Sequence, residues 1–363
     1  MIKVFIVEDS PVARQLLSHI LGSEPEIQVI GTANNGAEAL EVLSHKEPDV
    51  IIMDINMPKM NGFEATRRIM ETHPVPVIIV SATWDAKEVE TTFRAVEAGA
   101  VAVLEKPRGI SHPSHKSMAE ELVQTVKLMS EVKVVRRWAR HRKTEAVTTA
   151  PRKAEFQSTP KDIKVVAIGA STGGPQVLQT ILRRLPEDFS APVLIVQHIA
   201  AGFLEGLAEW LSQTTPLSIH IAKHGEYILP GHAYLAPDDF HLGVERIKSP
   251  NPLWERGYIG RIALSKDEPE NSLRPAVSSL FRSVAKAFGE NSVGVLLTGM
   301  GRDGAEELKL MREKGAVTIA QDKESSVVHG MPGEAIKLGA ATHVLPPDEI
   351  AAMLENLVNR KKV

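Results

Sequence analysis

The 363-residue sequence contains no cysteine. Disulfide bonds, thiol nucleophiles, thiolate metal sites and iron–sulfur clusters are therefore excluded. Aromatic residues are also few, with nine phenylalanines, three tyrosines and four tryptophans, so the chain cannot offer a stacking platform to single-stranded nucleic acid. The formal net charge is only −3, and no global field draws the protein to nucleic acid or to anionic lipid.

Long hydrophobic runs are missing as well. The apolar stretches at residues 77–80 and 193–196 are short, whereas a membrane-spanning helix needs about 20 residues. The acids Glu8 and Asp9 directly follow the first apolar run, which does not suit a signal peptide. We therefore expect a cytoplasmic protein without direct membrane insertion, and its length indicates two domains.

Short β-branched runs alternate with helix-length amphipathic segments along most of the chain, which is typical of a parallel α/β fold. The first half contains five such βα units and predicts a flavodoxin-like, doubly wound domain at residues 1–125. Its strands are expected at residues 3–7, 27–33, 50–54, 76–81 and 100–105.

The pattern then breaks in a basic, polar stretch with few large apolar residues, which predicts a linker at residues 126–163. A second doubly wound, mostly parallel α/β domain is expected at residues 164–363. Within it, turns rich in proline and glycine separate short segments, which we interpret as inserted β-hairpins. These segments lie at residues 233–236, 241–244 and 261–264.

Acidic side chains fall where strands of the first domain end. Glu8 and Asp9 follow the first strand and Asp54 follows the third, and the carboxyl ends of parallel strands converge on one crevice. Clustered carboxylates repel one another unless a hard cation such as Mg²⁺ binds between them. Lys106 and Ser81 end two further strands and suit an incoming phosphoryl group.

These residues make the first domain resemble a two-component receiver domain. The matching stretches are Glu8-Asp9, Met53-Asp-Ile-Asn-Met-Pro58, Gly62, Ser81-Ala82 and Lys106-Pro107. The resemblance implies that Asp54 is the phosphoacceptor and that Ser81 and Lys106 sense the phosphate. It also implies that Mg²⁺ is held by Glu8, Asp9, Asp54 and the Asn56 carbonyl, although the family commonly has aspartate where Glu8 stands.

The second domain opens with a strand that runs into a glycine-rich turn. Gly169, Ser171 and Gly173 have the G-x-S-x-G spacing of a nucleophile elbow. Small residues permit the sharp turn, and N–H groups at the following helix start could bind an oxyanion. The alternative is a dinucleotide loop, which expects an acid at the end of the next strand. That strand instead ends in Gln197 and His198.

A histidine after the neighbouring strand is what a serine nucleophile needs as its base. We therefore pair His198 with Ser171. Asp303 is the best candidate to orient the imidazole, because it also lies where a strand opens into a helix. An N-cap role suits Asp303 equally well, and spacing alone does not decide between the two.

Further stretches make the second domain resemble the catalytic domain of the chemotaxis protein-glutamate methylesterase/glutaminase family, and the domain order matches the whole enzyme. They are residues 168–174, Gln197-His198, residues 229–237, Arg274-Pro275, residues 297–304, Gln321-Asp322 and residues 327–332. The family's serine, histidine and aspartate fall on Ser171, His198 and Asp303, and Thr172 and Met300 match positions that line its active site.

The resemblance implies a phosphorylation-activated hydrolase that needs no cofactor for the esterase step. It would remove methyl esters from glutamate side chains, and deamidate glutamines, on the cytoplasmic helices of chemoreceptors. Its other partner would be a chemoreceptor-coupled histidine kinase, and no DNA is expected. The family often has Met-Pro-Pro-Gly-Phe-Thr after the histidine, where this chain has Ile199-Ala-Ala-Gly-Phe-Leu204, a difference that bears on receptor preference.

Two other functions fit parts of the sequence. A receiver fused to a DNA-binding output predicts a compact helix-turn-helix and a basic face, which the long α/β second half does not favour. A catalytically idle scaffold that only binds receptors is the second alternative, and the presence of all three triad residues argues against it.

Overall fold

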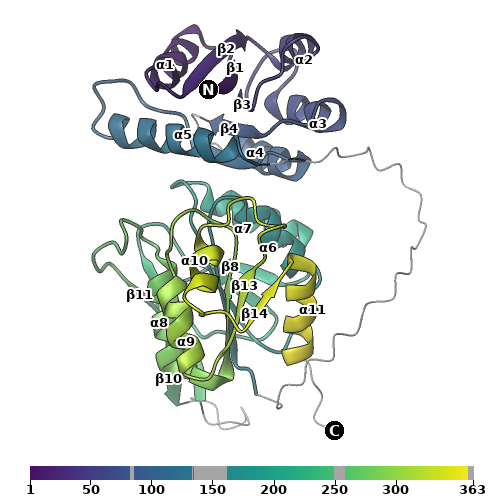
Figure 1. The fold of residues 1–363 in the computed structure, drawn as a ribbon. Helices are drawn as coiled ribbons and strands as arrows, with labels where there is room; N and C mark the ends of the chain where they lie inside the picture. The colour runs from purple at the N-terminus through teal and green to yellow at the C-terminus, as the bar shows by residue number, and fades with distance from the viewer. Residues whose placement is uncertain (82–85, 133, 135–161, 249–257, 359–363) are drawn as a thin grey trace, which may run out of the picture.

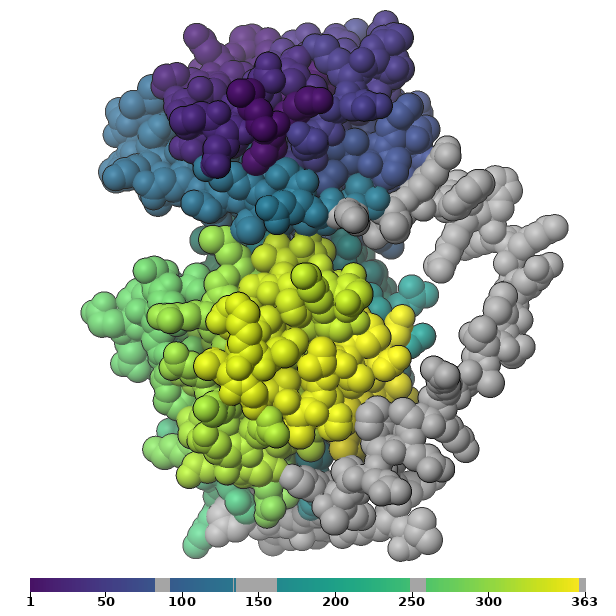
Figure 2. All heavy atoms as spheres, viewed as in Figure 1, coloured from purple at the N-terminus to yellow at the C-terminus, as the bar shows by residue number. Residues whose placement is uncertain are grey.

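The computed structural model describes residues 1–81, 86–132, 134, 162–248 and 258–358. Two α/β domains lie one above the other in Figure 1, and Figure 2 shows their surfaces in contact. The linker expected at residues 126–163 lies largely outside the described residues. Its first four residues, 126–129, instead belong to the last helix of the N-terminal domain, which ends at Met129.

The N-terminal domain alternates five strands with five helices. They are β1 (Ile2–Val7), α1 (Pro11–Gly22), β2 (Ile27–Ala33), α2 (Gly36–Leu43), β3 (Val50–Asp54), α3 (Gly62–Thr72), β4 (Val77–Ser81), α4 (Ala86–Ala98), β5 (Ala102–Glu105) and α5 (His115–Met129). Side chains also act as helix caps: Ser10, Asn35 and Asn61 accept backbone N–H groups at the starts of α1, α2 and α3.

The five strands form one parallel sheet in the order β2-β1-β3-β4-β5. This is the flavodoxin-like order that the sequence predicts, in which β1 and β3 are neighbours. Helices cover both faces: one hydrophobic cluster includes residues of α1 and α5, and the other includes residues of α2, α3 and α4. The carboxyl ends of β1, β3, β4 and β5 therefore meet along one edge.

The C-terminal domain contains the remaining elements of the described chain. They are β6 (Val165–Ala170), α6 (Gly174–Leu182), β7 (Val193–Gln197), α7 (Leu204–Thr214), β8 (Ser218–Ile221), β9 (His232–Leu235), β10 (His241–Lys248), β11 (Tyr258–Ser265), α8 (Val277–Phe288), the 3₁₀ turn η1 (Gly289–Asn291), β12 (Ser292–Leu296), α9 (Ala305–Glu313), β13 (Val317–Gln321), α10 (Met331–Lys337), β14 (His343–Leu345) and α11 (Pro347–Val358).

Seven of these strands form a parallel sheet in the order β14-β13-β12-β6-β7-β9-β8. Side chains alternate between its two faces, so Val166 and Ile168 pack towards α6, α7 and α11 while Val165 and Ala167 pack towards α8, α9 and α10. The central strand β6 lies between β12 and β7. The sequence prediction of a doubly wound, mostly parallel domain is confirmed.

One part of the hairpin prediction is wrong. Strands β10 and β11 do pair antiparallel, as a separate two-stranded sheet. The segment at residues 233–236 instead belongs to β9, which pairs parallel with both β7 and β8. The same flanking turns can precede a hairpin strand or a parallel strand. The two cases differ in the strand with which the segment pairs, and here one such strand is β7, about 40 residues earlier.

Candidate functional site

The acidic side chains at the strand ends of the N-terminal domain lie together. One carboxylate oxygen from each of Glu8, Asp9 and Asp54 lies within 4.8 Å of the others. This closeness follows from the pairing of β1 with β3. Glu8 and Asp54 are buried, whereas Asp9 is exposed, so the cluster opens to water on one side.

Lys106 is the cation of this cluster. Its Nζ lies 2.8 Å from Oε2 of Glu8 and 3.1 Å from Oδ1 of Asp54. Burial raises the pKa of Asp54 to about 6 despite the attraction of Lys106, and the charge of Glu8 acts in the same direction as burial. Three carboxylates against one ammonium leave negative charge that a hard cation can neutralise.

Three further residues match a receiver domain: Ser81, Asn56 and Gly62. Ser81 is buried at the end of β4, and its carbonyl accepts the N–H of Lys106 at 2.8 Å. Asn56 is exposed two residues after Asp54. Gly62 begins α3 against the backbone of Asp54, where a Cβ would lie 2.1 Å from the Asp54 carbonyl oxygen. The close approach of α3 thus depends on a residue without a side chain.

The turn after β6 places Ser171 at the start of α6, on the wall of a cavity. Gly173 has a φ of +79°, which favours glycine, and a Cβ there would lie 2.6 Å from Val327. The Ser171 N–H donates to the Thr298 carbonyl, and its carbonyl accepts the N–H of Gly174. The side chain of Ser171 is half-buried and lies on the wall of a cavity.

His198 and Asp303 come from the strands on either side of β6. His198 directly follows β7 and Asp303 lies in the loop between β12 and α9. The Nε2 atom of His198 lies 3.0 Å from Oδ2 of Asp303. Burial opposes ionisation of Asp303, but the His198 ring and hydrogen bonds from Ser278 and Val277 outweigh it and hold the pKa of Asp303 below its usual value.

The Nδ1 atom of His198 is therefore the ring nitrogen left for Ser171. Within the described chain, Ser171 Oγ has no hydrogen bond, although both side chains line the same cavity. Catalytic hydrogen bonds often tighten only when substrate binds. Thr172 and Met300 line this cavity too, and Met300 is 47% exposed.

Two residues near the serine received no role from the sequence. The Gln197 side chain is buried, and its Nε2 donates to the carbonyls of Ser171 and His198 at 2.8 and 2.7 Å. Ser278 donates to Asp303 at 2.6 Å. Gln197 stands beside His198 in a stretch that matches the family and could have been found. Ser278 is one of many serines, and nothing in the sequence distinguishes it.

The cavity has a volume of 660 Å³ and lies between the two domains. The C-terminal domain contributes Ser171 and His198, and the N-terminal domain contributes Glu121 and Gln124 of α5 to the opposite wall. Burial and the charge of Glu105 raise the pKa of Glu121.

A ring stack and two hydrogen bonds hold α4 of the N-terminal domain, and the residues just after it, against α6 and α7. The ring of Phe93 stacks on Trp210 with centroids 5.6 Å apart. Gln176 donates from Nε2 to the carbonyls of Val96 and Ala100 at 2.5 and 2.9 Å. The N-terminal domain therefore covers one side of the cavity that contains Ser171.

None of the helices in the described parts of the chain is long and apolar enough to cross a bilayer.

Fold and site define a two-domain protein in which a domain of the receiver class covers an α/β domain with a serine elbow. The response regulator receiver domain model matches residues 4–112, and the CheB methylesterase model matches residues 166–354. The chain belongs to the CheB methylesterase family. Residues 166–354 therefore match a methylesterase catalytic domain and not a helix-turn-helix output domain.

Relatives match almost the whole chain. A protein-glutamate methylesterase/protein-glutamine glutaminase from Geobacter metallireducens is 56% identical over 361 residues, covering 99% of this chain and all of the relative. One from Nitrosospira multiformis is 54% identical over 358 residues, covering 99% and 97%. The crystal structure of the Thermotoga maritima CheB methylesterase catalytic domain is 39% identical, with a TM-score of 0.50, and covers 54% of this chain and 99% of that one.

Proposed function

We propose that the protein hydrolyses methyl esters of glutamate side chains, and deamidates glutamine side chains, on the cytoplasmic helices of chemoreceptors. Ser171 is the nucleophile, His198 the general base and Asp303 the residue that orients the imidazole. The observation that carries this assignment is the 3.0 Å contact between His198 Nε2 and Asp303 Oδ2, beside a serine elbow on the neighbouring strand. The relatives' names supply the substrate class.

In the first half-reaction, Nδ1 of His198 takes the proton of Ser171 as Oγ attacks the side-chain carbonyl carbon. Backbone N–H groups at the start of α6 stabilise the oxyanion, and losing one such donor typically costs about 10²–10³ in rate. The proton moves from His198 to the leaving group, which departs as methanol from an ester or as ammonia from an amide. Asp303 stabilises the imidazolium that forms in between.

In the second half-reaction, water hydrolyses the acyl-enzyme. His198 accepts a proton from the water as its oxygen attacks the acyl carbon, and then returns that proton to Ser171 Oγ. The products are a glutamate side chain and the regenerated enzyme. The same steps serve ester and amide, which explains how one site can have both activities.

The acidic cluster is the proposed phosphorylation site. Glu8, Asp9, Asp54 and the Asn56 carbonyl would hold Mg²⁺, and the three clustered carboxylates provide the hard oxygen ligands that this ion prefers. The ion would neutralise phosphoryl oxygens when bound. Asp54 accepts the phosphoryl group from a chemoreceptor-coupled histidine kinase, while Lys106 and Ser81 respond to it.

Regulation follows from the position of the N-terminal domain. In this arrangement α5 forms one wall of the cavity that contains Ser171, and a receptor helix needs that space. Phosphorylation of Asp54 replaces a carboxylate of charge −1 with a phosphoryl group that carries about two negative charges. This added charge lies beside Ser81 and Lys106, at the ends of the strands next to α4 and α5, and releases the covering domain. The cytoplasmic location expected from the sequence stays a prediction.

The test is methanol release from methylated receptor membranes, with and without a small phosphodonor. Ser171→Ala should abolish release, whereas Ser212→Ala, an exposed serine of α7, should release methanol like the wild type. Retained activity in Ser171→Ala would overturn the assignment. Receptor binding by a wild-type protein that releases no methanol would instead support the idle scaffold.

A further inference from the structure

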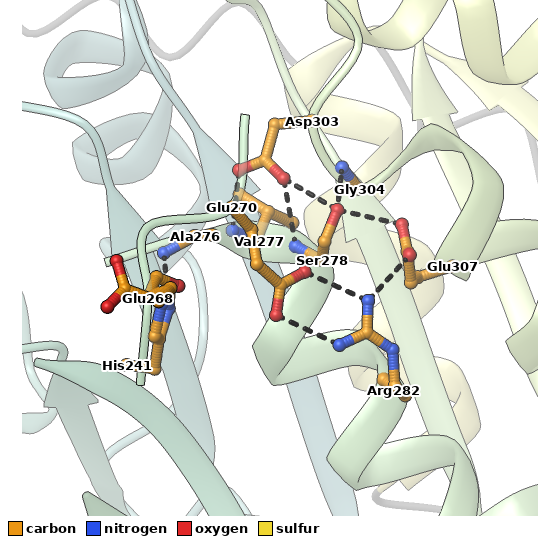
Figure 3. A network of polar contacts seen from close by, with 10 residues as sticks. All are labelled: His241, Glu268, Glu270, Ala276, Val277, Ser278, Arg282, Asp303, Gly304 and Glu307. Atoms are coloured by element: carbon orange, nitrogen blue, oxygen red, sulfur yellow. Dashed lines mark hydrogen bonds and ion pairs between the residues drawn. The ribbon is translucent and has the colours of Figure 1, made fainter. Parts of the chain in front are cut away.

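The carboxylate of Asp303 is held by the start of helix α8 (Figure 3). Its Oδ2 accepts the N–H of Val277 at 2.6 Å, and its Oδ1 accepts the N–H of Ser278 at 3.1 Å. The residue before the helix is Ala276, which has no side chain able to cap these groups. Asp303 therefore caps α8 from another part of the chain, and the positive end of the helix stabilises its charge.

Ser278 adds a third hydrogen bond, from its side chain. Its Oγ lies 2.6 Å from Oδ1 of Asp303 and is almost fully buried. The same oxygen lies 2.8 Å from Oε2 of Glu307 and accepts the N–H of Gly304 at 3.1 Å. A hydroxyl has one hydrogen to donate, so Asp303 and Glu307 compete for it.

Arg282 binds the competing carboxylate. Its Nη2 lies 2.9 Å from Oε1 of Glu307, and its two terminal nitrogens each lie 2.9 Å from an oxygen of Glu270. Figure 3 shows these residues as one connected network that ends at Asp303. Because Arg282 neutralises Glu307, the demand of Glu307 for the serine hydrogen is reduced.

We propose that Ser278 is a positioning residue for Asp303, and that the ion pair between Arg282 and Glu307 keeps the Ser278 hydroxyl hydrogen on Asp303. This inference rests on the proposed function of Asp303 in the triad. Ser278 fixes Oδ1, so that Oδ2 stays directed at His198. The side chain of Arg282 is 50% exposed, and an exposed ion pair adds little to stability, so its effect is on orientation.

The first test compares two neighbouring serines in the full-length protein. Ser278→Ala should lower kcat for methanol release by about 10-fold with KM within about two-fold, because Ser278 is buried and does not line the cavity that contains Ser171. Ser279→Ala, the matched control, should leave both constants unchanged. Circular dichroism gives the folded fraction of each variant, to which kcat is normalised, so a loss of folded protein does not count as a loss of orientation.

The second test uses the exposed end of the network. Arg282→Gln should lower kcat by about three-fold in the wild-type background, because Glu307 then competes for the serine hydrogen. It should have no effect in Ser278→Ala, where that hydrogen is gone. A purely structural role of Arg282 predicts the same loss in both backgrounds.

The possible outcomes distinguish a failure of the Ser278 positioning role from a failure of the proposed function. If the wild type releases methanol and Ser278→Ala matches Ser279→Ala in kcat, the positioning role is refuted while the triad stands. If Arg282→Gln lowers kcat equally in both backgrounds, the role of the ion pair is refuted. If the wild type releases no more methanol than Ser171→Ala, the proposed function fails and the positioning role falls with it.

Discussion

Phe93 offers the sharpest test of how the N-terminal domain controls the site. It lies on α4 of the receiver domain, yet it packs in a hydrophobic cluster made of residues from the catalytic domain and is only 1% exposed. Its ring stacks on Trp210 of α7. Conversely, Val328 of the catalytic domain packs in a hydrophobic cluster of receiver-domain residues. Phe93→Ala removes one half of this reciprocal contact and leaves Ser171, His198 and Asp303 in place, although Phe93 also lines the cavity that contains Ser171.

The size of the effect follows from the burial. Hiding a phenylalanine side chain from water contributes about 1.5–3 kcal/mol, and an aromatic pair adds roughly 0.5–1.5 kcal/mol. The covered arrangement should therefore lose roughly 2–4.5 kcal/mol, and each 1.4 kcal/mol changes the ratio of covered to open molecules about tenfold. Basal activity should rise by about 30-fold or more, up to the ceiling set by the fully open enzyme.

The assay is methanol release from methylated receptor membranes by the unphosphorylated protein and by the protein with a phosphodonor. In Phe93→Ala the basal rate should approach the stimulated rate, so their ratio should fall towards one. Arg94→Ala is the matched control, because Arg94 lies on the same helix but its guanidinium stacks on Phe63 of α3. A folded Phe93→Ala protein whose basal rate equals that of Arg94→Ala would refute the inhibitory contact.

The remaining predictions concern the two sites themselves. Gly62→Ala should destabilise the receiver domain by about 1–3 kcal/mol or more, because the new Cβ would lie 2.1 Å from the backbone of Asp54. Gly22→Ala is the control: a Cβ there meets no atom within 4 Å, so the change should be neutral or stabilising by up to about 1 kcal/mol. Thermal unfolding compares the two variants, and equal melting temperatures would contradict this prediction. Asp303→Asn should lower kcat by about 10⁴-fold. Since folding lowers the pKa of Asp303, its charge stabilises the fold above the unfolded pKa of about 4 and this contribution is lost as pH falls through the folded pKa. The stability gap between wild type and Asp303→Asn, measured by urea unfolding, should therefore narrow below about pH 4, and a constant gap down to pH 3 would contradict it.

Much of the fold could be predicted from local patterns. The alternation of apolar runs with amphipathic segments indicates the βα units of both domains, because burial on both faces of a parallel sheet demands continuous apolar strands. The pairing partner of β9 could not be predicted, since its short strand carries the same flanking turns as a hairpin. Its partner β7 is distant in sequence, and the pairing of β9 with β7 depends on how all the strands of the sheet are ordered.

The placement of the candidate site residues was predictable for a related reason. Asp54, Ser171 and His198 each stand directly after or at the end of a strand, and the carboxyl ends of parallel strands converge at one edge. Placing a residue at a strand end is a local property that the sequence itself determines. The same reasoning identified Lys106, which the structure places between Glu8 and Asp54.

The sequence by itself determined which residues stand at the strand ends, and thereby the candidate nucleophile, base and phosphoacceptor. Only the tertiary structure decided that β12 lies beside β6, so that Asp303 faces Nε2 of His198. It alone placed Ser278 against Asp303 and Phe93 against Trp210. The physical reason is that these contacts join residues from about 25 to more than 100 positions apart, whose meeting depends on strand order and domain packing, neither of which leaves a periodic signal in the chain.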